Sequence, residues 1–150
     1  MASEHTAKAF DSDLQGLTRL VAEMGGLAER MITESVDALI RRDVALGKRV
    51  VVSDLEIDRL QHLIEERAVL TIARRRYHDV ADDDDHEIGR QIVGAMRVAT
   101  DLERIGDLAK NMGKRVAALE NDFQPLKLIR GLEHMTDLVQ SQVKSVLDAY

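Results

Sequence analysis

The sequence contains no cysteine, no tryptophan and a single proline, Pro125. The absence of cysteine excludes disulfides, thiolate zinc sites and cysteine nucleophiles. Aromatic residues make up only 3% of the chain, whereas strands favour aromatic and β-branched side chains. A single proline permits very long helices, and Ala, Leu, Glu, Arg and Met suit them. The composition therefore predicts an all-α protein.

Long hydrophobic runs and an excess of basic residues are also missing. No apolar run approaches the ~20 residues that span a membrane. The first residues show no basic segment followed by an apolar one, so we expect no signal peptide and a cytoplasmic protein. The formal net charge of −6 argues against general nucleic-acid binding. With 45% hydrophobic and 32% charged residues, the chain has the balance of a globular domain.

Apolar residues recur at helical spacing in four stretches. The first helix is expected over 10–42, where Gly25-Gly26 interrupts the seam and indicates close packing against a neighbour rather than a hinge. The second is expected to start near Asp43, a plausible N-cap, and to end near Arg76. Its apolar stripe comprises Val50, Ile57, Leu60, Leu63, Ile64 and Leu70.

The third helix is expected over 86–121, after an acidic loop whose Asp84 or Asp85 suits the N-cap position. Small residues dominate its seam, so a neighbouring helix can approach closely. Its stripe comprises Ile88, Ile92, Ala95, Ala99, Leu102, Gly106, Ala109, Gly113 and Val116. A fourth helix should start at Pro125 and continue in phase to Tyr150.

Three long helices close a small bundle, so the fourth is expected to open a second one. We therefore divide the chain into a three-helix bundle of long antiparallel helices over 1–121 and the first helix of a second, incomplete bundle over 122–150. The fourth helix carries the apolar stripe Leu132, Met135, Val139, Val143 and Val146. Either this stripe folds back on the first bundle or it pairs with another chain, and we expect a homo-oligomer.

The most informative residues are acids at helical spacing. Asp54 and Asp58 stand four apart, as do Glu103 and Asp107 on the next helix, and this spacing puts each pair on one helix face. Like charges there repel, and Asp54 lies on the apolar seam itself, so both pairs need a cation, an arginine or water. Together with Asn111 they form an oxygen-only set suited to magnesium, manganese, calcium or iron.

Two other interpretations of these acids remain open. In one, the side chains of Arg59, Arg104 and Lys110 neutralise the carboxylates on a wet surface without any metal. In the other, His62, four residues after Asp58, joins a ligand row.

The sequence around these acids resembles the signature of the PhoU family, whose members are accessory proteins of phosphate transport and phosphate signalling. The second acidic motif stands in the string Asp101-Leu-Glu-Arg-Ile-Gly-Asp107, followed by Leu-Ala-Lys-Asn111. The first stands in Val52-Ser-Asp54-Leu-Glu-Ile-Asp58, and the resemblance covers roughly residues 8–150. The chain departs from the family over residues 76–89, where the family has a short turn. This segment is longer than the family's turn, lacks its proline and is far more acidic.

The resemblance implies two tandem three-helix bundles whose acidic motifs hold metal ions on the bundle surface. Carried over, the metal ligands are Asp54, Asp58, Glu103 and Asp107, with manganese, iron or magnesium as the ion. It also implies a non-enzymatic negative regulator that links the ATPase subunit of a phosphate importer to a sensor histidine kinase. Such a protein would reach the membrane only peripherally, through these partners.

Two further functions compete with this regulator. One is a carboxylate-bridged metalloenzyme, although no Glu-x-x-His pair of the kind used by helical di-iron sites is present in the sequence. The other is a plain helical scaffold without metal.

Overall fold

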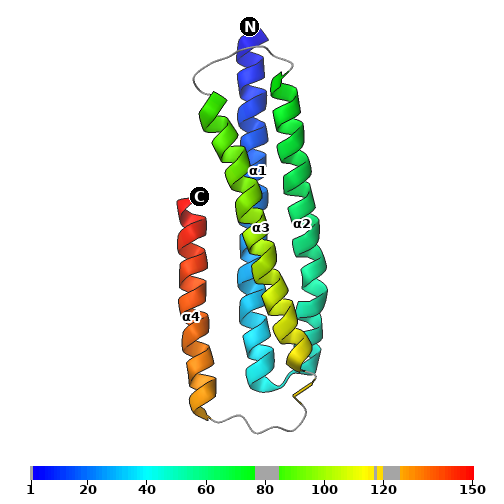
Figure 1. Cartoon of the computed structure of the whole chain (residues 1–150), viewed down its shortest axis with the longest axis vertical. Helices are drawn as coiled ribbons and strands as arrows, with labels where there is room; N and C mark the ends of the chain where they lie inside the picture. The colour runs from blue at the N-terminus through cyan, green and yellow to red at the C-terminus, as the bar shows by residue number, and fades with distance from the viewer. Residues whose placement is uncertain (1, 77–84, 117, 120–125) are drawn as a thin grey trace.

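The structure is a computed structural model that describes residues 2–76, 85–116, 118–119 and 126–150. It contains helices α1 (Ala2–Arg41), α2 (Val44–Arg76), α3 (Asp85–Val116) and α4 (Leu126–Ala149). Helices α1, α2 and α3 run up and down beside one another as a long bundle, and α4 lies against one side of its lower half (Figure 1). No strand occurs in the described ranges, and the predicted all-α bundle is confirmed.

The core of the bundle follows the predicted seams closely. Leu17, Met24 and Met31 of α1 are buried, as are Ile57 and Ile64 of α2. From α3 the buried apolar residues are Ile92, Ala95, Ala99, Leu102, Ala109 and Val116. The prediction was wrong for Leu70, which is 48% exposed, because the second stripe is broader than the face that packs.

Two helix ends differ from the predicted ranges. α1 begins at Ala2 rather than near residue 10, because the range was predicted from apolar periodicity alone, and a helix can extend beyond a periodic apolar stripe. α3 ends at Val116 rather than near residue 121. Of the two predicted N-caps of α3, Asp85 is the first residue of the helix and Asp84 lies outside the described residues. Pro125, predicted in the first turn of the fourth helix, also lies outside them.

A tight turn joins α1 to α2. Arg42 adopts the left-handed conformation at φ 56°, which reverses the chain directly after α1. The Asp43 amide donates to the carbonyl of Ala38 at 2.9 Å, and the Leu46 amide donates to Asp43 Oδ1 at 2.8 Å. Asp43 is therefore the N-cap of α2, as predicted.

Glycines bring α2 and α3 into close contact. A Cβ added to Gly113 would lie 2.7 Å from the carbonyl oxygen of Gly47, so the two backbones leave no room for a side chain. About two helical turns before Gly113, a Cβ on Gly106 would lie 3.2 Å from the side chain of Ile57. The predicted seam of small residues is confirmed, and it sets α3 directly against α2.

Helix α4 packs against α1. A Cβ on Gly25 would lie 2.5 Å from the side chain of Leu147, which confirms close packing at this glycine. Gly26, in contrast, faces open space. The side-chain amide of Gln140 also donates to the hydroxyl of Thr33.

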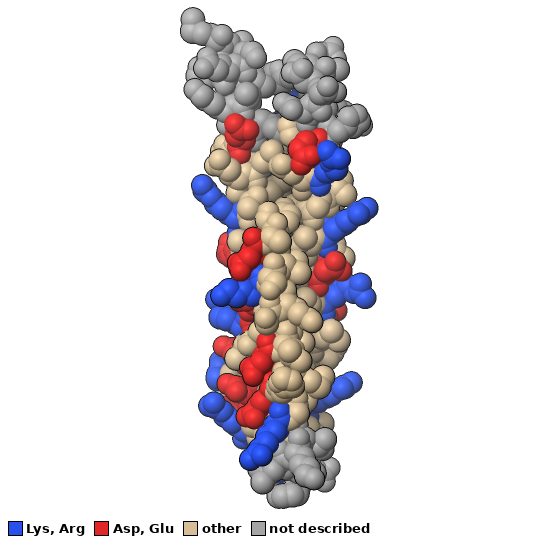
Figure 2. Space-filling view, turned by 90° about the vertical axis from the view of Figure 1, so that its left-hand side faces the viewer, with Lys and Arg blue, Asp and Glu red and all other residues tan. Residues whose placement is uncertain are grey.

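One apolar flank of α4 stays uncovered. A strip without charged side chains runs along the middle of the face that carries α4 (Figure 2). The large apolar residues of α4 that remain exposed are Met135, Leu138, Val139 and Val146. None of the helices in the described part of the chain is long and apolar enough to cross a membrane.

Candidate acidic site

The four predicted site residues sit on the two helices that the glycines hold together. Asp54 and Asp58 lie on α2, and Glu103 and Asp107 lie on α3. Asp54 is buried at 4% exposure, whereas the other three are partly exposed. The structure thus places one carboxylate in the seam and the others towards the surface.

A lysine joins the two helices at this point. The Lys110 ammonium donates to Asp54 Oδ2 at 2.6 Å, across from α3 to α2, and it also pairs with the carboxylate of Asp107 on its own helix. These partners raise the pKa of Lys110 well above its ordinary value, the hydrogen bond from Asp107 most and that from Asp54 next, although burial opposes them. Lys110 therefore stays charged and compensates the buried Asp54.

Glu103 shows that the carboxylates share one electrostatic environment. Burial raises the pKa of the Glu103 carboxyl above its ordinary value. The charges of Asp107, Asp58 and Asp54 raise this pKa further, in that order. Lys110 acts in the opposite direction. The convergence of the two acidic pairs on a common metal ion stays a prediction.

The fit of this site to a metal ion is mixed. Its donors are all carboxylate oxygens, the ligands that hard cations take. Yet among the residues whose positions are described, no three Asp, Glu, His or Cys side chains lie close enough together to hold an ion. In this arrangement, the cation between Asp54 and Asp107 is the ammonium group of Lys110.

The other predicted neutralising residues bind elsewhere. Arg59 pairs with Glu56 at 2.6 Å, and Arg104 lies 3.8 Å from Asp101. Each pair is exposed and lies within one helix, so it contributes little stability. Of the three basic residues considered from the sequence, Lys110 is the one that reaches the site.

His62 does not extend the acidic row in this structure. Its Nδ1 lies 2.7 Å from the backbone carbonyl oxygen of Asp58, and its side chain is exposed. Asn111 is exposed as well. From the sequence, Lys110 was predicted only as one of three basic residues that could neutralise the acids. Its position three residues after Asp107 already favoured the Lys110–Asp107 contact.

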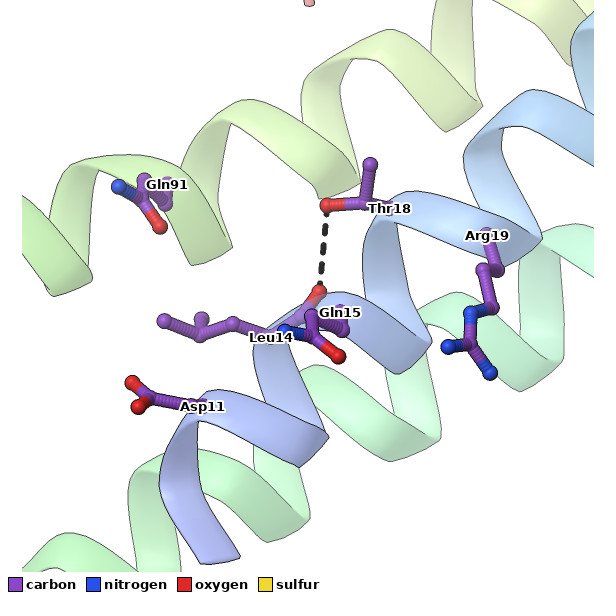
Figure 3. Close-up of a pocket in the computed structure, with 6 residues that line it drawn as sticks. All are labelled: Asp11, Leu14, Gln15, Thr18, Arg19 and Gln91. Carbon is purple, nitrogen blue, oxygen red and sulfur yellow. Dashed lines mark hydrogen bonds between the residues drawn. The ribbon is translucent and has the colours of Figure 1, made fainter. Parts of the chain in front are cut away.

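A separate groove of about 440 Å³ lies between α1 and α3 (Figure 3). Its lining residues are Asp11, Leu14, Gln15, Thr18 and Arg19 of α1 and Gln91 of α3. The Thr18 hydroxyl donates to the backbone carbonyl of Leu14 at 3.2 Å. The lining carries the carboxylate of Asp11 and the guanidinium of Arg19, about two helical turns apart, and these two groups do not form a catalytic pair.

The bundle and its acidic seam define a helical protein of the PhoU type. The sequence model described as "PhoU domain" matches residues 21–116, which include all four site residues. The chain therefore belongs to the PhoU domain family.

Curated relatives extend this similarity to the whole chain. The chain is 46% identical over 150 residues to the phosphate-specific transport system accessory protein PhoU homolog of Rhizobium meliloti, covering 100% of the chain and 60% of that relative. It is 40% identical over 148 residues to the homolog of Caulobacter vibrioides, covering 99% and 61%. The homolog of Clostridium acetobutylicum is 32% identical over 145 residues, covering 97% and 63%. The chain thus spans about three fifths of the length of these relatives.

Proposed function

We propose that this chain belongs to a regulatory accessory protein of phosphate transport that carries out no catalysis itself. The observation that carries the proposal is the family match over residues 21–116, joined to relatives named as accessory proteins of phosphate-specific transport. Its finer form is a cytoplasmic negative regulator that links the ATPase subunit of the importer to a sensor histidine kinase. The long helices of the bundle supply an extended surface for such partners.

A pull-down tests this function directly. The full chain, tagged and purified, is offered the importer ATPase subunit and the sensor kinase of the phosphate response in separate experiments. We expect retention of both partners. Retention of neither, with the bait helical by circular dichroism, would remove the adaptor function from this part of the protein.

We also propose that the acidic site binds manganese, iron or magnesium through Asp54, Asp58, Glu103 and Asp107. The support is the donor chemistry, the approach of α2 to α3, and the burial and carboxylate repulsion that together raise the pKa of Glu103. A divalent ion would supply positive charge where four carboxylates repel one another. The same site without metal would make the protein a plain helical scaffold.

The metal proposal is tested with the double variant Asp54→Asn, Glu103→Gln. We expect the parent chain to bind Mn²⁺ in a calorimetric titration and the double variant to lose that binding with its helicity unchanged. The matched control is Glu87→Gln with Asp101→Asn, which makes the same charge change at exposed, arginine-paired positions of α3. Equal binding by the double variant and the parent would refute the assignment.

A further inference from the structure

Basic side chains gather at one end of the bundle. The turn between α1 and α2, the start of α2 and the end of α3 all lie at this end (Figure 1). Gly47 and Gly113 touch here, so the cations that directly follow them, Lys48 and Lys114, stand at the same level of the bundle. The exposed basic residues of these three segments, which we call the basic end, are Arg41, Arg42, Lys48, Arg49, Lys114 and Arg115.

Little negative charge offsets the basic end in the described structure. No acidic residue occurs from Val44 to Ser53. Asp43 is occupied as the N-cap of α2, and Asp37 lies 3.7 Å from Arg41. The other five cations form no ion pair with a described side chain. On a chain whose formal net charge is −6, this local excess of positive charge favours an anionic partner.

The start of α2 also exposes apolar side chains among these cations. Val52 and Leu55 are 64% and 69% exposed, and Val44 is 37% exposed. Separations of four, four and three residues place them on one outward face of the helix together with a lysine. This face, the α2 ridge, comprises Val44, Lys48, Val52 and Leu55. Grouped apolar side chains at a surface mark contacts with proteins or membranes.

We propose that the α2 ridge and the cations beside it bind the surface of an anionic membrane. Val52 and Leu55 enter the headgroup region, and the ammonium groups of Lys48 and Lys114 pair with lipid phosphates. Helices that combine these residue types lie in the interface in this way. The stems of Lys and Arg cover apolar surface while their charged heads stay with the phosphates.

The shape of the ridge favours a lipid surface over a protein partner. The ridge is convex, because it is the outer face of a single helix, and the hollows that the structure describes lie elsewhere, between α1 and α3 and beside α1 and α4. Protein partners draw most of their affinity from anchors that fill pockets. A lipid surface instead adapts to a convex ridge. This inference goes beyond the proposed adaptor, since direct contact with lipid needs neither a protein partner nor a metal.

Vesicle sedimentation tests the electrostatic part. The full, metal-free chain is mixed with vesicles of phosphatidylglycerol and phosphatidylcholine, or of phosphatidylcholine alone. We expect binding to the anionic vesicles only, weakening steeply as salt rises. Lys48→Gln with Lys114→Gln should lower the affinity about 25-fold, because each cation near an anionic surface contributes about fivefold. A parent chain that does not bind, or a double variant that binds as well as the parent, would overturn the proposal.

The matched charge control is Arg19→Gln with Arg97→Gln. Both arginines are exposed, and the two changes alter the net charge by the same amount. Arg97 precedes Lys114 on α3 by 17 residues, or about 25 Å, which exceeds the screening length of about 10 Å at 0.1 M salt. The affinity of this control should stay within about twofold of the parent. A loss equal to that at the basic end would assign binding to net charge and overturn the proposal.

The apolar part is tested at constant charge. Val52→Gln with Leu55→Gln should weaken binding to the anionic vesicles at least about fivefold, because both side chains lose the burial of apolar surface. The control is Val69→Gln with Ile72→Gln, which are 59% and 40% exposed on the same helix but lie beyond the acidic Glu66. This control should bind like the parent. Equal affinities for the two double variants would refute insertion of the ridge.

Insertion can also be observed directly. Because the sequence has no cysteine, one introduced cysteine carries a polarity-sensitive fluorophore at a single position. The emission of labelled Val52→Cys should shift to the blue on anionic vesicles, while that of labelled Val69→Cys stays unchanged. An unshifted label at residue 52 would overturn the proposal. Binding of the parent to polyglutamate as tightly as to the vesicles would do so as well, because it would assign the surface to an acidic protein.

Discussion

At the scale of single residues, the acidic site is a compromise between burial and charge. Asp54 lies in the seam and obtains a cation from the neighbouring helix through Lys110. Glu103 obtains no such partner in the described structure, and its raised pKa records both its burial and the repulsion around it. Asp54 is therefore stabilised by an opposite charge, whereas Glu103 is destabilised by burial and by the neighbouring carboxylates.

Glu103 predicts a pH dependence with a definite sign. Because its folded-state pKa is raised, the folded chain binds more protons than the unfolded one above the ordinary value of 4.5. The contribution of Glu103 to stability is therefore complete below that pH and is lost as pH rises through the raised pKa. In metal-free protein, Glu103→Gln should gain about 0.3 kcal/mol at about pH 7, the size of one like-charge pair.

The measurement is urea unfolding in the presence of a chelator at about pH 7 and again at about pH 4. The gain should disappear at the lower pH, where Glu103 is protonated. Asp101→Asn is the control, since Asp101 is exposed and lies 3.8 Å from Arg104. A gain of equal size at both pH values would show that charge is not its origin.

At the scale of elements, glycines decide where helices touch. Gly113 and Gly47 let α3 and α2 meet backbone to backbone, and Gly25 receives Leu147 of α4. Gly26, the immediate neighbour, has no atom within 4 Å of its added Cβ. Glycines that look alike in the sequence thus have opposite roles in packing.

Alanine substitutions should separate these roles. Gly113→Ala puts its Cβ against a carbonyl oxygen that cannot turn aside, and we expect it to lower stability by about 1–3 kcal/mol. Gly26→Ala meets nothing, and its better helix propensity should raise stability by up to about 1 kcal/mol. Urea unfolding followed by circular dichroism measures both, and a loss at Gly26 as large as that at Gly113 would contradict the assignment.

At the scale of the whole molecule, α4 is the element with the least burial. It rests on α1 through Leu147 and Gln140, while Met135, Val139 and Val146 stay exposed. An apolar strip of this length approaches the few hundred Å² that single chains tolerate. Folding back on the first bundle, one of the two outcomes considered from the sequence, therefore covers only part of the helix.

We expect the chain to self-associate through this uncovered flank. Light scattering across a concentration series should show a rising mass for the parent chain and a constant mass for Val139→Gln, Val146→Gln. Deleting residues 124–150 should abolish association and leave residues 1–123 folded, because α1, α2 and α3 share one core.

The control removes the same kind of surface elsewhere. Val52 and Leu55 of α2 are 64% and 69% exposed, so Val52→Gln, Leu55→Gln deletes comparable apolar surface away from α4. This variant should associate like the parent. A parent chain that stays monomeric at high concentration would contradict the prediction.

The division into a complete bundle over 1–121 and the opening of a second over 122–150 remains a prediction. α1, α2 and α3 contribute the buried core. Among the residues whose burial is described, α4 adds only Leu147, which is partly buried against that core.

The sequence by itself determined the helices, their seams and the faces that carry the acids. Periodicity at 3.6 residues per turn is a local property, so it placed Asp54, Asp58, Glu103 and Asp107 on their faces without any tertiary information. The N-cap at Asp43 was equally local. At the start of α1, the helix extends to Ala2, beyond the range that apolar periodicity predicted.

Only the tertiary structure decided which groups meet across helices. The pairing of Lys110 with Asp54 depends on the spacing and rotation of α3 against α2, which the contact of Gly113 with Gly47 fixes. The same holds for Leu147 against Gly25, because these residues are distant in sequence. Contacts between helices arise from three-dimensional packing, in which a shift of one residue changes the partner, and no periodic pattern within one helix records that choice.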